Sequence, residues 1–185
     1  MPTLRGKDKP SIFLLEPISR EKENAKHHTK NEDALTAYSA LVDAIYPVVQ
    51  TRTLQADALD QLELAFRNSH KIVWETAGNY MVILSHYFED ALERFRKLAN
   101  DPKAAIRLRA VQSQFSSTVP EPFLTELLTQ GLRDSSEQVR SFAASRCGQF
   151  KRTDLAELLQ RQAVAETSQR VLRNLSFAVE ELQRS

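Results

Sequence analysis

The most constraining feature of this sequence is a pattern that recurs about every 33 residues. Counting from Asp134, a valine follows five residues later, an arginine six residues later and an alanine nine residues later. The same offsets from three other polar residues give related sets: Ile106, Arg107 and Ala110 after Asp101; Val73, Trp74 and Ala77 after Asn68; Val171, Leu172 and Leu175 after Glu166. A repeat of this length is typical of stacked helix pairs.

An apolar ladder precedes three of these polar positions, with residues spaced three or four apart. The ladders are Leu59, Leu62 and Phe66; Leu124, Leu127, Leu128 and Leu132; and Leu155, Leu158, Leu159 and Val164. Such spacing places side chains on one face of an α-helix. A single helix pair cannot cover its own apolar face, so neighbouring pairs must stack to bury it. The repeat therefore predicts an all-α solenoid.

Two copies of the repeat, DPKAAIR and DSSEQVR, place an aspartate in the turn and an arginine six residues later. This pairing resembles the HEAT repeat family, which belongs to the HEAT/armadillo-like α-solenoids. The resemblance covers roughly residues 54–184 and implies a right-handed solenoid of about four helix pairs, preceded by a leading helix. It also implies a ladder that joins each turn to the second helix of the same or the next repeat, formed here by Asp101, Arg107, Asp134 and Arg140.

The outer repeats depart from this pairing. Trp74 follows Asn68 at the arginine position, and Leu172 follows Glu166. A solenoid needs terminal repeats that differ from the inner ones. These departures therefore indicate that the outer repeats are caps.

The pattern also predicts where the helices lie. We expect helices at about 31–50, 54–67, 69–77, 80–98, 120–132 and 167–183. Pro47 is predicted to kink the first of them or to end it early, because proline lacks the backbone N–H that an interior helical position uses. Gly78 and Asn79 are predicted to separate the third of these helices from the fourth.

Residues 1–30 differ from the rest, because alternating lysines and glutamates with interspersed prolines leave little apolar surface to bury. We therefore divide the chain into a charged, partly disordered N-terminal arm, 1–30, and a HEAT-like α-solenoid domain, 31–185. The apolar island of Ile12, Phe13, Leu14 and Leu15 is the exception. It is predicted either to pack against the first helices or to remain floppy.

Composition agrees with a helical protein that has a sizeable core. The chain has 42% hydrophobic residues, with only 4 glycines and 7 prolines among 185 residues. The single cysteine excludes an internal disulfide, and the sequence begins without a secretory hydrophobic segment. We therefore predict a cytoplasmic location and no membrane insertion, since no apolar run is long enough to span a bilayer.

Candidate catalytic groups are few. His86, Glu89, Asp90 and Glu93 have helical spacing, but a helical zinc motif would need a second histidine four residues away. We expect His86 to be partly buried and the three acids to face water. Cys147 is predicted to be a core residue rather than a nucleophile. The sequence thus predicts a protein that is not an enzyme, with no catalytic residues, no metal and no cofactor.

Candidate partner-binding residues lie on the predicted second helices: Trp74, Lys103, Arg107, Arg140 and Arg173. Stacked repeats would place the basic members in a row, spaced by about one helix diameter of 10 Å. Such a row could bind an acidic peptide or a phosphate backbone. The alternative for Arg107 and Arg140 is the internal ladder. Trp74 is either an exposed anchor for a partner or a residue that packs inside a capping repeat.

Charge is distributed unevenly along the chain. Residues 1–93 carry 10 Lys and Arg against 14 Asp and Glu, whereas residues 94–185 carry 15 against 10. This balance favours a non-catalytic protein-interaction module, either an adaptor or scaffold or an antidote that inhibits a partner protein. It would bind another protein or peptide through the stacked second helices. The alternative is nucleic-acid binding through the basic C-terminal half. The sequence favours no particular oligomeric state.

Overall fold

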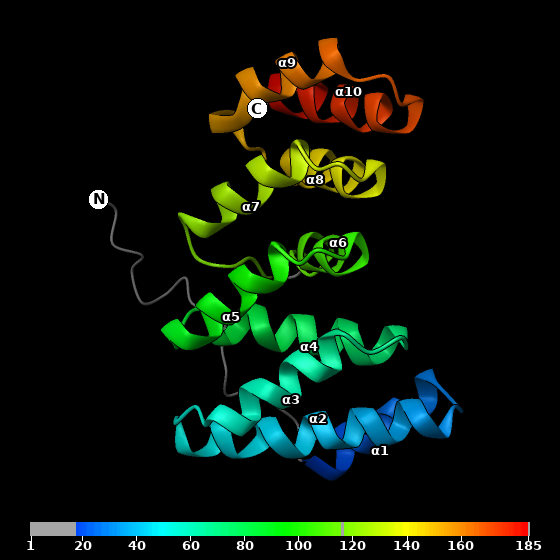
Figure 1. The fold of residues 1–185 in the computed structure, drawn as a ribbon, viewed down its shortest axis with the longest axis vertical. Helices are drawn as coiled ribbons and strands as arrows, with labels where there is room; N and C mark the ends of the chain where they lie inside the picture. Colours follow the sequence, from blue (N-terminus) through cyan, green and yellow to red (C-terminus); the bar gives the residue numbers. More distant parts are fainter. Residues whose placement is uncertain (1–17, 116, 185) are drawn as a thin grey trace. The chain divides into compact units, whose positions relative to one another are not determined.

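The computed structural model describes residues 18–115 and 117–184, and within them every regular element is a helix (Figure 1). The elements are α1 (Ile18–His28), α2 (Glu32–Thr51), α3 (Ala56–Phe66), α4 (Lys71–Leu84), α5 (Glu89–Ala99), α6 (Ala104–Gln112), α7 (Phe123–Leu132), α8 (Glu137–Gln149), a short 3-10 helix η1 (Thr153–Leu155), α9 (Ala156–Ala165) and α10 (Gln169–Gln183). The predicted all-α class is confirmed. The apolar island Ile12–Leu15 lies outside the described residues.

None of the helices in the described ranges combines the length and the hydrophobicity that crossing a membrane requires.

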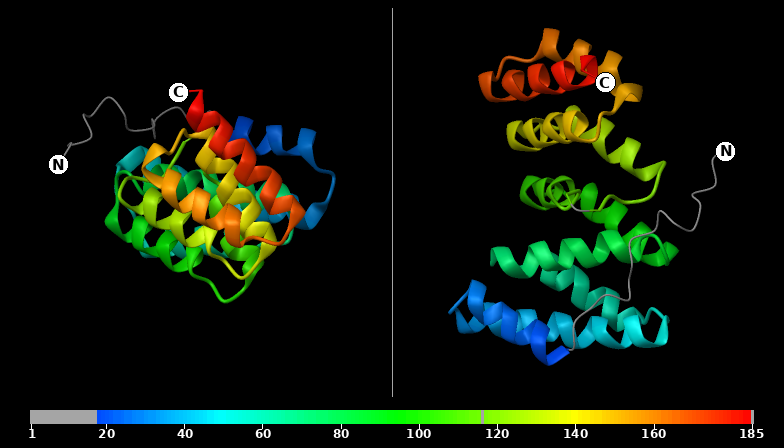
Figure 2. Two further views of the ribbon diagram at one scale, coloured as in Figure 1. Left: turned by 90° about the horizontal axis from the view of Figure 1, so that it is seen from above. Right: turned by 180° about the vertical axis from the view of Figure 1, so that it is seen from behind.

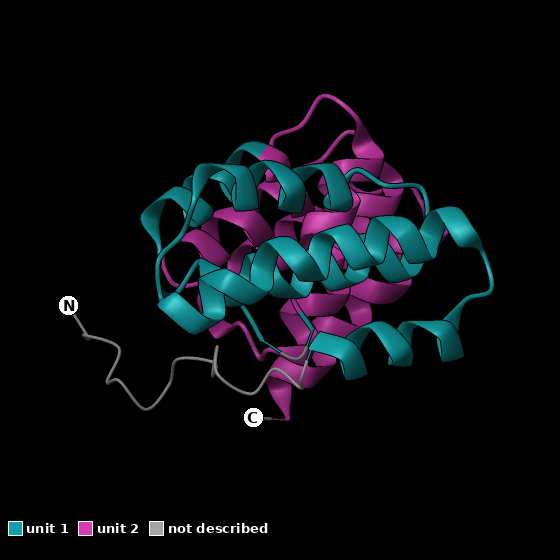
Figure 3. Cartoon of the chain, turned by 90° about the horizontal axis from the view of Figure 1, so that it is seen from below, with its two compact units in different colours: residues 1–97, 115–119 teal, residues 98–114, 120–185 magenta. Residues whose placement is uncertain are grey.

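The chain divides into two compact units (Figure 3). Unit 1 contains residues 1–97 and 115–119, and unit 2 contains residues 98–114 and 120–185. Each unit has its own buried side chains.

Unit 1 is built around α2, which packs against α1, α3 and α4, while α3 also packs against α4. The side chains of Leu41, Ile45, Leu62 and Met81 are almost completely buried between these helices. The rings of Phe66 and Phe95 meet edge to face, with centroids 5.9 Å apart. Edge-to-face contact suits the charge distribution of aromatic rings, so this pair adds directional packing to the apolar burial.

Unit 2 has a layer of second helices, in which α8 packs against α6 on one side and against α10 on the other (Figures 1 and 2). The first helices α7 and α9 pack against α8 and α10 respectively. Phe123, Leu128, Leu132 and Leu159 fill the space between the first and second helices. Unit 2 therefore consists of α6 and two helix pairs, α7–α8 and α9–α10, which stack through α6, α8 and α10.

Neither of the helix ends predicted at Pro47 and at Gly78 occurs. Helix α2 does not end at Pro47 but continues to Thr51, and the Thr51 hydroxyl donates to the Pro47 carbonyl at 2.9 Å. Helix α4 continues through Gly78 to Leu84. A glycine inside a helix costs only about 1 kcal/mol, and burying the residues beyond it offsets that cost. Those residues are Tyr80, Met81, Val82 and Leu84.

The N-terminal arm also differs from expectation, because residues 18–28 of the predicted 1–30 arm form helix α1. Its composition is polar, and Ala25 is the only buried residue that α1 contributes. Helix α1 is therefore formed by helix-favouring residues lying against α2, rather than by an apolar stripe.

Candidate partner-binding surface

The four polar positions that define the sequence repeat form one recurring turn. In each turn a side-chain oxygen accepts a hydrogen bond from the backbone N–H two residues later. The pairs are Asn68 with His70 at 2.8 Å, Asp101 with Lys103 at 2.8 Å, Asp134 with Ser136 at 2.7 Å, and Glu166 with Ser168 at 2.9 Å. The four donors are the N-cap residues of α4, α6, α8 and α10. The repeated acceptor thus fixes the turn that starts each second helix.

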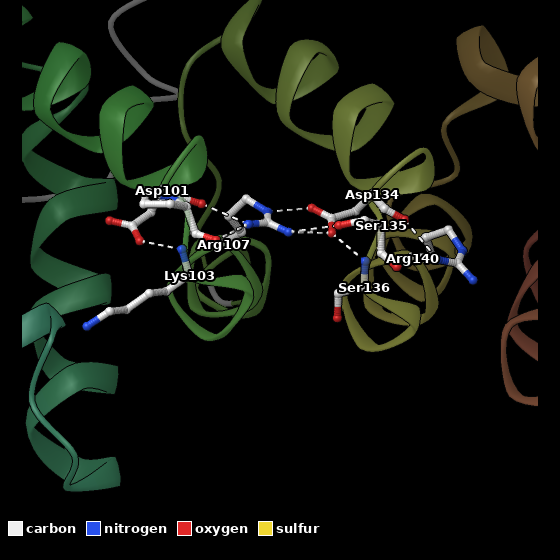
Figure 4. Close-up of polar contacts among 8 residues, drawn as sticks. Asp101, Lys103, Arg107, Asp134, Ser135, Ser136 and Arg140 are labelled. Carbon is white, nitrogen blue, oxygen red and sulfur yellow. Dashed lines mark hydrogen bonds and ion pairs between the residues drawn. The ribbon is translucent and has the colours of Figure 1, made fainter.

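The Arg107 side chain ties one such turn to the next (Figure 4). Its Nε and Nη2 donate to the two carboxylate oxygens of Asp134 at 2.7 and 2.8 Å. Its Nη1 donates to the backbone carbonyls of Asp101 and Pro102 at 2.8 and 3.1 Å. The bidentate pair is largely shielded from water, since the side chains of Arg107 and Asp134 are 17% and 9% exposed.

Arg140 repeats this geometry one helix pair later. Its Nε and Nη2 donate to the carboxylate of Glu166 at 2.7 and 3.1 Å. Its Nη1 donates to the carbonyls of Asp134 and Ser135 at 2.8 and 3.2 Å. Bidentate arginine–carboxylate pairs are stronger and more directional than single ion pairs. Unit 2 therefore contains a ladder in which each arginine joins the turn of its own repeat to the acid of the following one.

The ladder bears on the two alternatives that the sequence left open for Arg107 and Arg140. The structure places both guanidinium groups in the internal ladder, with their donors directed at Asp134 and Glu166. It also extends one step beyond the two matching repeats, because Glu166 serves as the acid although Leu172 replaces its own arginine. Comparing aspartate and arginine within one repeat missed this step, since each pair spans two repeats.

The ladder acids have lowered pKa values. Hydrogen bonds from Arg140 and from the backbone N–H groups of Ser168 and Thr167 lower the pKa of Glu166 to about 2. Burial would raise the pKa of Asp134, but hydrogen bonds from Arg107 and the Ser136 N–H outweigh burial and hold that pKa below its ordinary value. Both acids therefore remain charged in the folded protein where a free carboxyl would already be protonated.

We expect acid to weaken the fold through Glu166. Its folded pKa lies below its unfolded value, so its contribution is complete above pH 4.5 and is lost as the pH falls from 4.5 towards 2. Urea unfolding followed by circular dichroism at several pH values measures this loss. In the Glu166→Gln variant, which can still accept the Ser168 N–H, the free energy of unfolding is expected to fall less steeply over this range. An identical pH slope in the variant would contradict the assignment.

Arg173 does not continue the ladder. The ladder position of the last repeat is held by Leu172, and Arg173 follows it, about 100° further round α10. The spacing from Arg140 to Arg173 is one period, but the last turn arrives one residue early, at Glu166. Within the described residues, the exposed Arg173 side chain forms no hydrogen bond or ion pair.

The other two candidate residues lie on different units. Lys103 in unit 2 is exposed, and its side chain points away from Arg107 (Figure 4), without an ion pair to any described residue. Trp74 lies on α4 of unit 1 and is half-buried. Lys103 and Arg173 are therefore the basic candidates of unit 2 whose charges the described part of the chain does not neutralise.

A second polar cluster in unit 2 was not predicted from the sequence. The Arg152 guanidinium donates to Glu121 at 2.6 Å, to both oxygens of Asp154 at 2.8 and 2.6 Å, and to the Thr125 hydroxyl at 2.6 Å. The hydrogen bond from Arg152 lowers the pKa of Asp154. The cluster joins the start of α7 to the turn before α9. Glu121 and Asp154 are one repeat apart in the sequence, but neither belongs to a motif that would have identified the cluster.

The layer of second helices in unit 2 also carries polar links that the sequence did not reveal. Asn174 on α10 donates to the Ser141 carbonyl at 3.0 Å and to its hydroxyl at 2.7 Å. Arg146 on α8 donates to the carbonyl of Gln112 at 3.0 Å. These residues hold neighbouring second helices in register, and their partners lie about one repeat away, beyond the reach of local patterns.

The candidate catalytic groups take the positions expected of structural residues. His86 lies in the turn after α4, half-buried, with its Nε2 2.7 Å from the Thr118 carbonyl, so it does not share a helix with Glu89, Asp90 and Glu93. Those three acids are exposed. Cys147 is fully buried, and burial raises the pKa of its thiol to about 12. Such a thiol carries almost no nucleophilic thiolate near neutral pH.

Comparison with known proteins gives no relative from which a site could be transferred, because no protein-family model and no curated protein matches this sequence.

Proposed function

We propose that this chain is a non-catalytic protein-interaction module built as a right-handed, HEAT-like α-solenoid. It binds another protein or peptide through the outer surface of the second helices of unit 2 and acts as an adaptor or as an inhibitor of its partner. Lys103 on the turn before α6 and Arg173 on α10 are the proposed contact residues. Trp74 on α4 is proposed as an additional anchor in unit 1.

The observation that carries this proposal is that some basic residues of unit 2 are paired with internal acids and others are not. Arg107 and Arg140 are held by Asp134 and Glu166, so they stiffen the layer formed by α6, α8 and α10. Lys103, in the turn that starts α6, and Arg173, on α10, are exposed and have no such partners among the described residues. A rigid surface with unneutralised charges at fixed positions favours recognition of a complementary acidic surface, because little conformational entropy is lost on binding.

The two exposed cations provide the test. We expect the Lys103→Glu/Arg173→Glu double variant to bind the native partner at least about tenfold more weakly, corresponding to about 1.4 kcal/mol of binding free energy. The partner is first recovered from host lysate with the wild-type chain, after nuclease treatment and at physiological salt. Its affinity for each variant is then measured with purified proteins.

Lys151→Glu/Arg161→Glu is the matched control, because it makes the same charge change at exposed residues in the turn after α8 and on α9. Its affinity for the partner is expected to stay close to that of the wild type. Equal weakening by both double variants would show that overall charge matters rather than this surface. If the retained material were nucleic acid, lost as salt is raised, the nucleic-acid alternative would replace the proposal.

A further inference from the structure

Helix α1 is attached to unit 1 in a different way from the other helices. Among its residues, only Ala25 is buried. By contrast α2 buries six side chains, among them Leu41, Val42 and Ile45. Since apolar burial is the main source of helix docking energy, α1 is held by far less of it than its neighbour.

Polar contacts join α1 to α2. The Lys22 ammonium donates to both oxygens of Asp43 at 2.6 and 2.8 Å, and these side chains are 32% and 56% exposed. The Tyr38 hydroxyl is 3.4 Å from a Glu21 carboxylate oxygen, at the long end for a hydrogen bond. Ion pairs that are this exposed add little stability, because water competes for both charges.

On the side that faces α4, the described residues leave part of α1 uncovered. A groove of about 630 Å³ runs there. One wall is formed by residues of α1, including Glu21, Asn24 and His28, and the other by residues of α4, including Thr76. Tyr38 of α2, which is 6% exposed, also lines the groove. Moving α1 would therefore enlarge an existing groove and uncover the Tyr38 ring, without separating α2 from α3 or α4.

We propose that α1 is a detachable strap, which leaves α2 and loses its helical structure while α2, α3 and α4 remain folded. An isolated helix of eleven residues is only marginally stable in water, so undocking and unwinding occur together. The short link 29–31 keeps the released segment close to its docking site. Release of the strap thus widens the groove and exposes the Tyr38 ring, independently of the partner-binding surface proposed for unit 2.

Hydrogen exchange measured by mass spectrometry on the full-length chain tests this inference. The amides of α1 are expected to exchange at least about 100-fold faster than those in the centre of α2, because they open without global unfolding. Exchange of both helices at one common rate would overturn the proposal, since the two would then open together.

A charge reversal at the contact between α1 and α2 tests the docking of α1. Lys22→Glu sets a carboxylate against Asp43 and is expected to accelerate exchange in α1 by about threefold to tenfold, while α2, α3 and α4 are unchanged. Lys26→Glu is the matched control, because Lys26 pairs with Glu23 within α1 itself, at 2.8 Å. The exchanged pair Lys22→Glu/Asp43→Lys is expected to restore slow exchange. Equal acceleration in α1 and α2 by Lys22→Glu would refute an independent strap.

Discussion

The Asp134→Ala variant is expected to lose about 2–4 kcal/mol of its free energy of unfolding. The substitution removes the carboxylate that receives both Arg107 donors and the N–H of Ser136. The Arg107 guanidinium would keep its two carbonyl acceptors but lose its counter-charge in a place where its side chain is 17% exposed. Urea denaturation followed by circular dichroism at 222 nm measures the change.

Two further variants show whether the loss comes from the ladder. The Arg107→Ala and Arg107→Ala/Asp134→Ala variants complete a double-mutant cycle, in which we expect a coupling energy of about 1–3 kcal/mol. Glu180→Ala is the control, since Glu180 lies 3.8 Å from Arg184 and both side chains are more than 60% exposed. It is expected to change stability by less than about 0.5 kcal/mol. A coupling energy near zero would mean that the two side chains stabilise the fold independently.

Replacement of Gly148 by valine is expected to destabilise unit 2 by about 2–4 kcal/mol. A Cβ atom at this buried position would lie 2.9 Å from the Ala178 Cα and 2.9 Å from the Phe177 ring. The ring can move because Phe177 is 40% exposed, but the Ala178 backbone is fixed by α10. Helices α8 and α10 must therefore move apart to admit the new side chain, and urea unfolding by circular dichroism measures the cost.

A smaller substitution at Gly148 and a control substitution at an exposed position show whether close packing causes the loss of stability. Gly148→Ala gains about 1 kcal/mol of helix propensity but meets the same backbone, so it is expected to fall between the wild type and the valine variant. Ser176→Val introduces the same β-branched residue at an exposed position of α10 and is expected to cost less than about 0.5 kcal/mol. If Gly148→Val unfolded like Ser176→Val, close packing of α8 on α10 would be refuted.

The features predicted correctly from the sequence are those that recur within it. Asp101 and Asp134 stood out because each is followed at a fixed distance by an apolar residue and an arginine, and the structure gives both the same turn. The helical class followed from apolar spacing alone. The ladder itself was expected from resemblance, and the structure supplies its direction, from each arginine to the acid of the next repeat.

Two of the features that were missed depend on tertiary contacts, which local sequence does not encode. Gly78 suggested an interruption because its intrinsic cost in a helix is known, whereas the compensating burial of Met81 and Leu84 is a tertiary effect. The Arg152 cluster collects partners from residues about 30 positions away. Helix α1 escaped prediction for the opposite reason, since it forms with hardly any apolar burial.

Each arginine of the ladder binds the acid of the following repeat, and this direction has a consequence for how such a chain can gain repeats. The Asp134 turn offers two carbonyls to Arg140 and a carboxylate to Arg107, the arginine of the preceding repeat. After a tandem duplication of residues 101–133, each new junction would thus pair an arginine with the aspartate of the following repeat. Leu172, which has no guanidinium to offer, closes the series after Glu166. A repeat inserted within unit 2 could therefore join the ladder, whereas a repeat added after α10 could not.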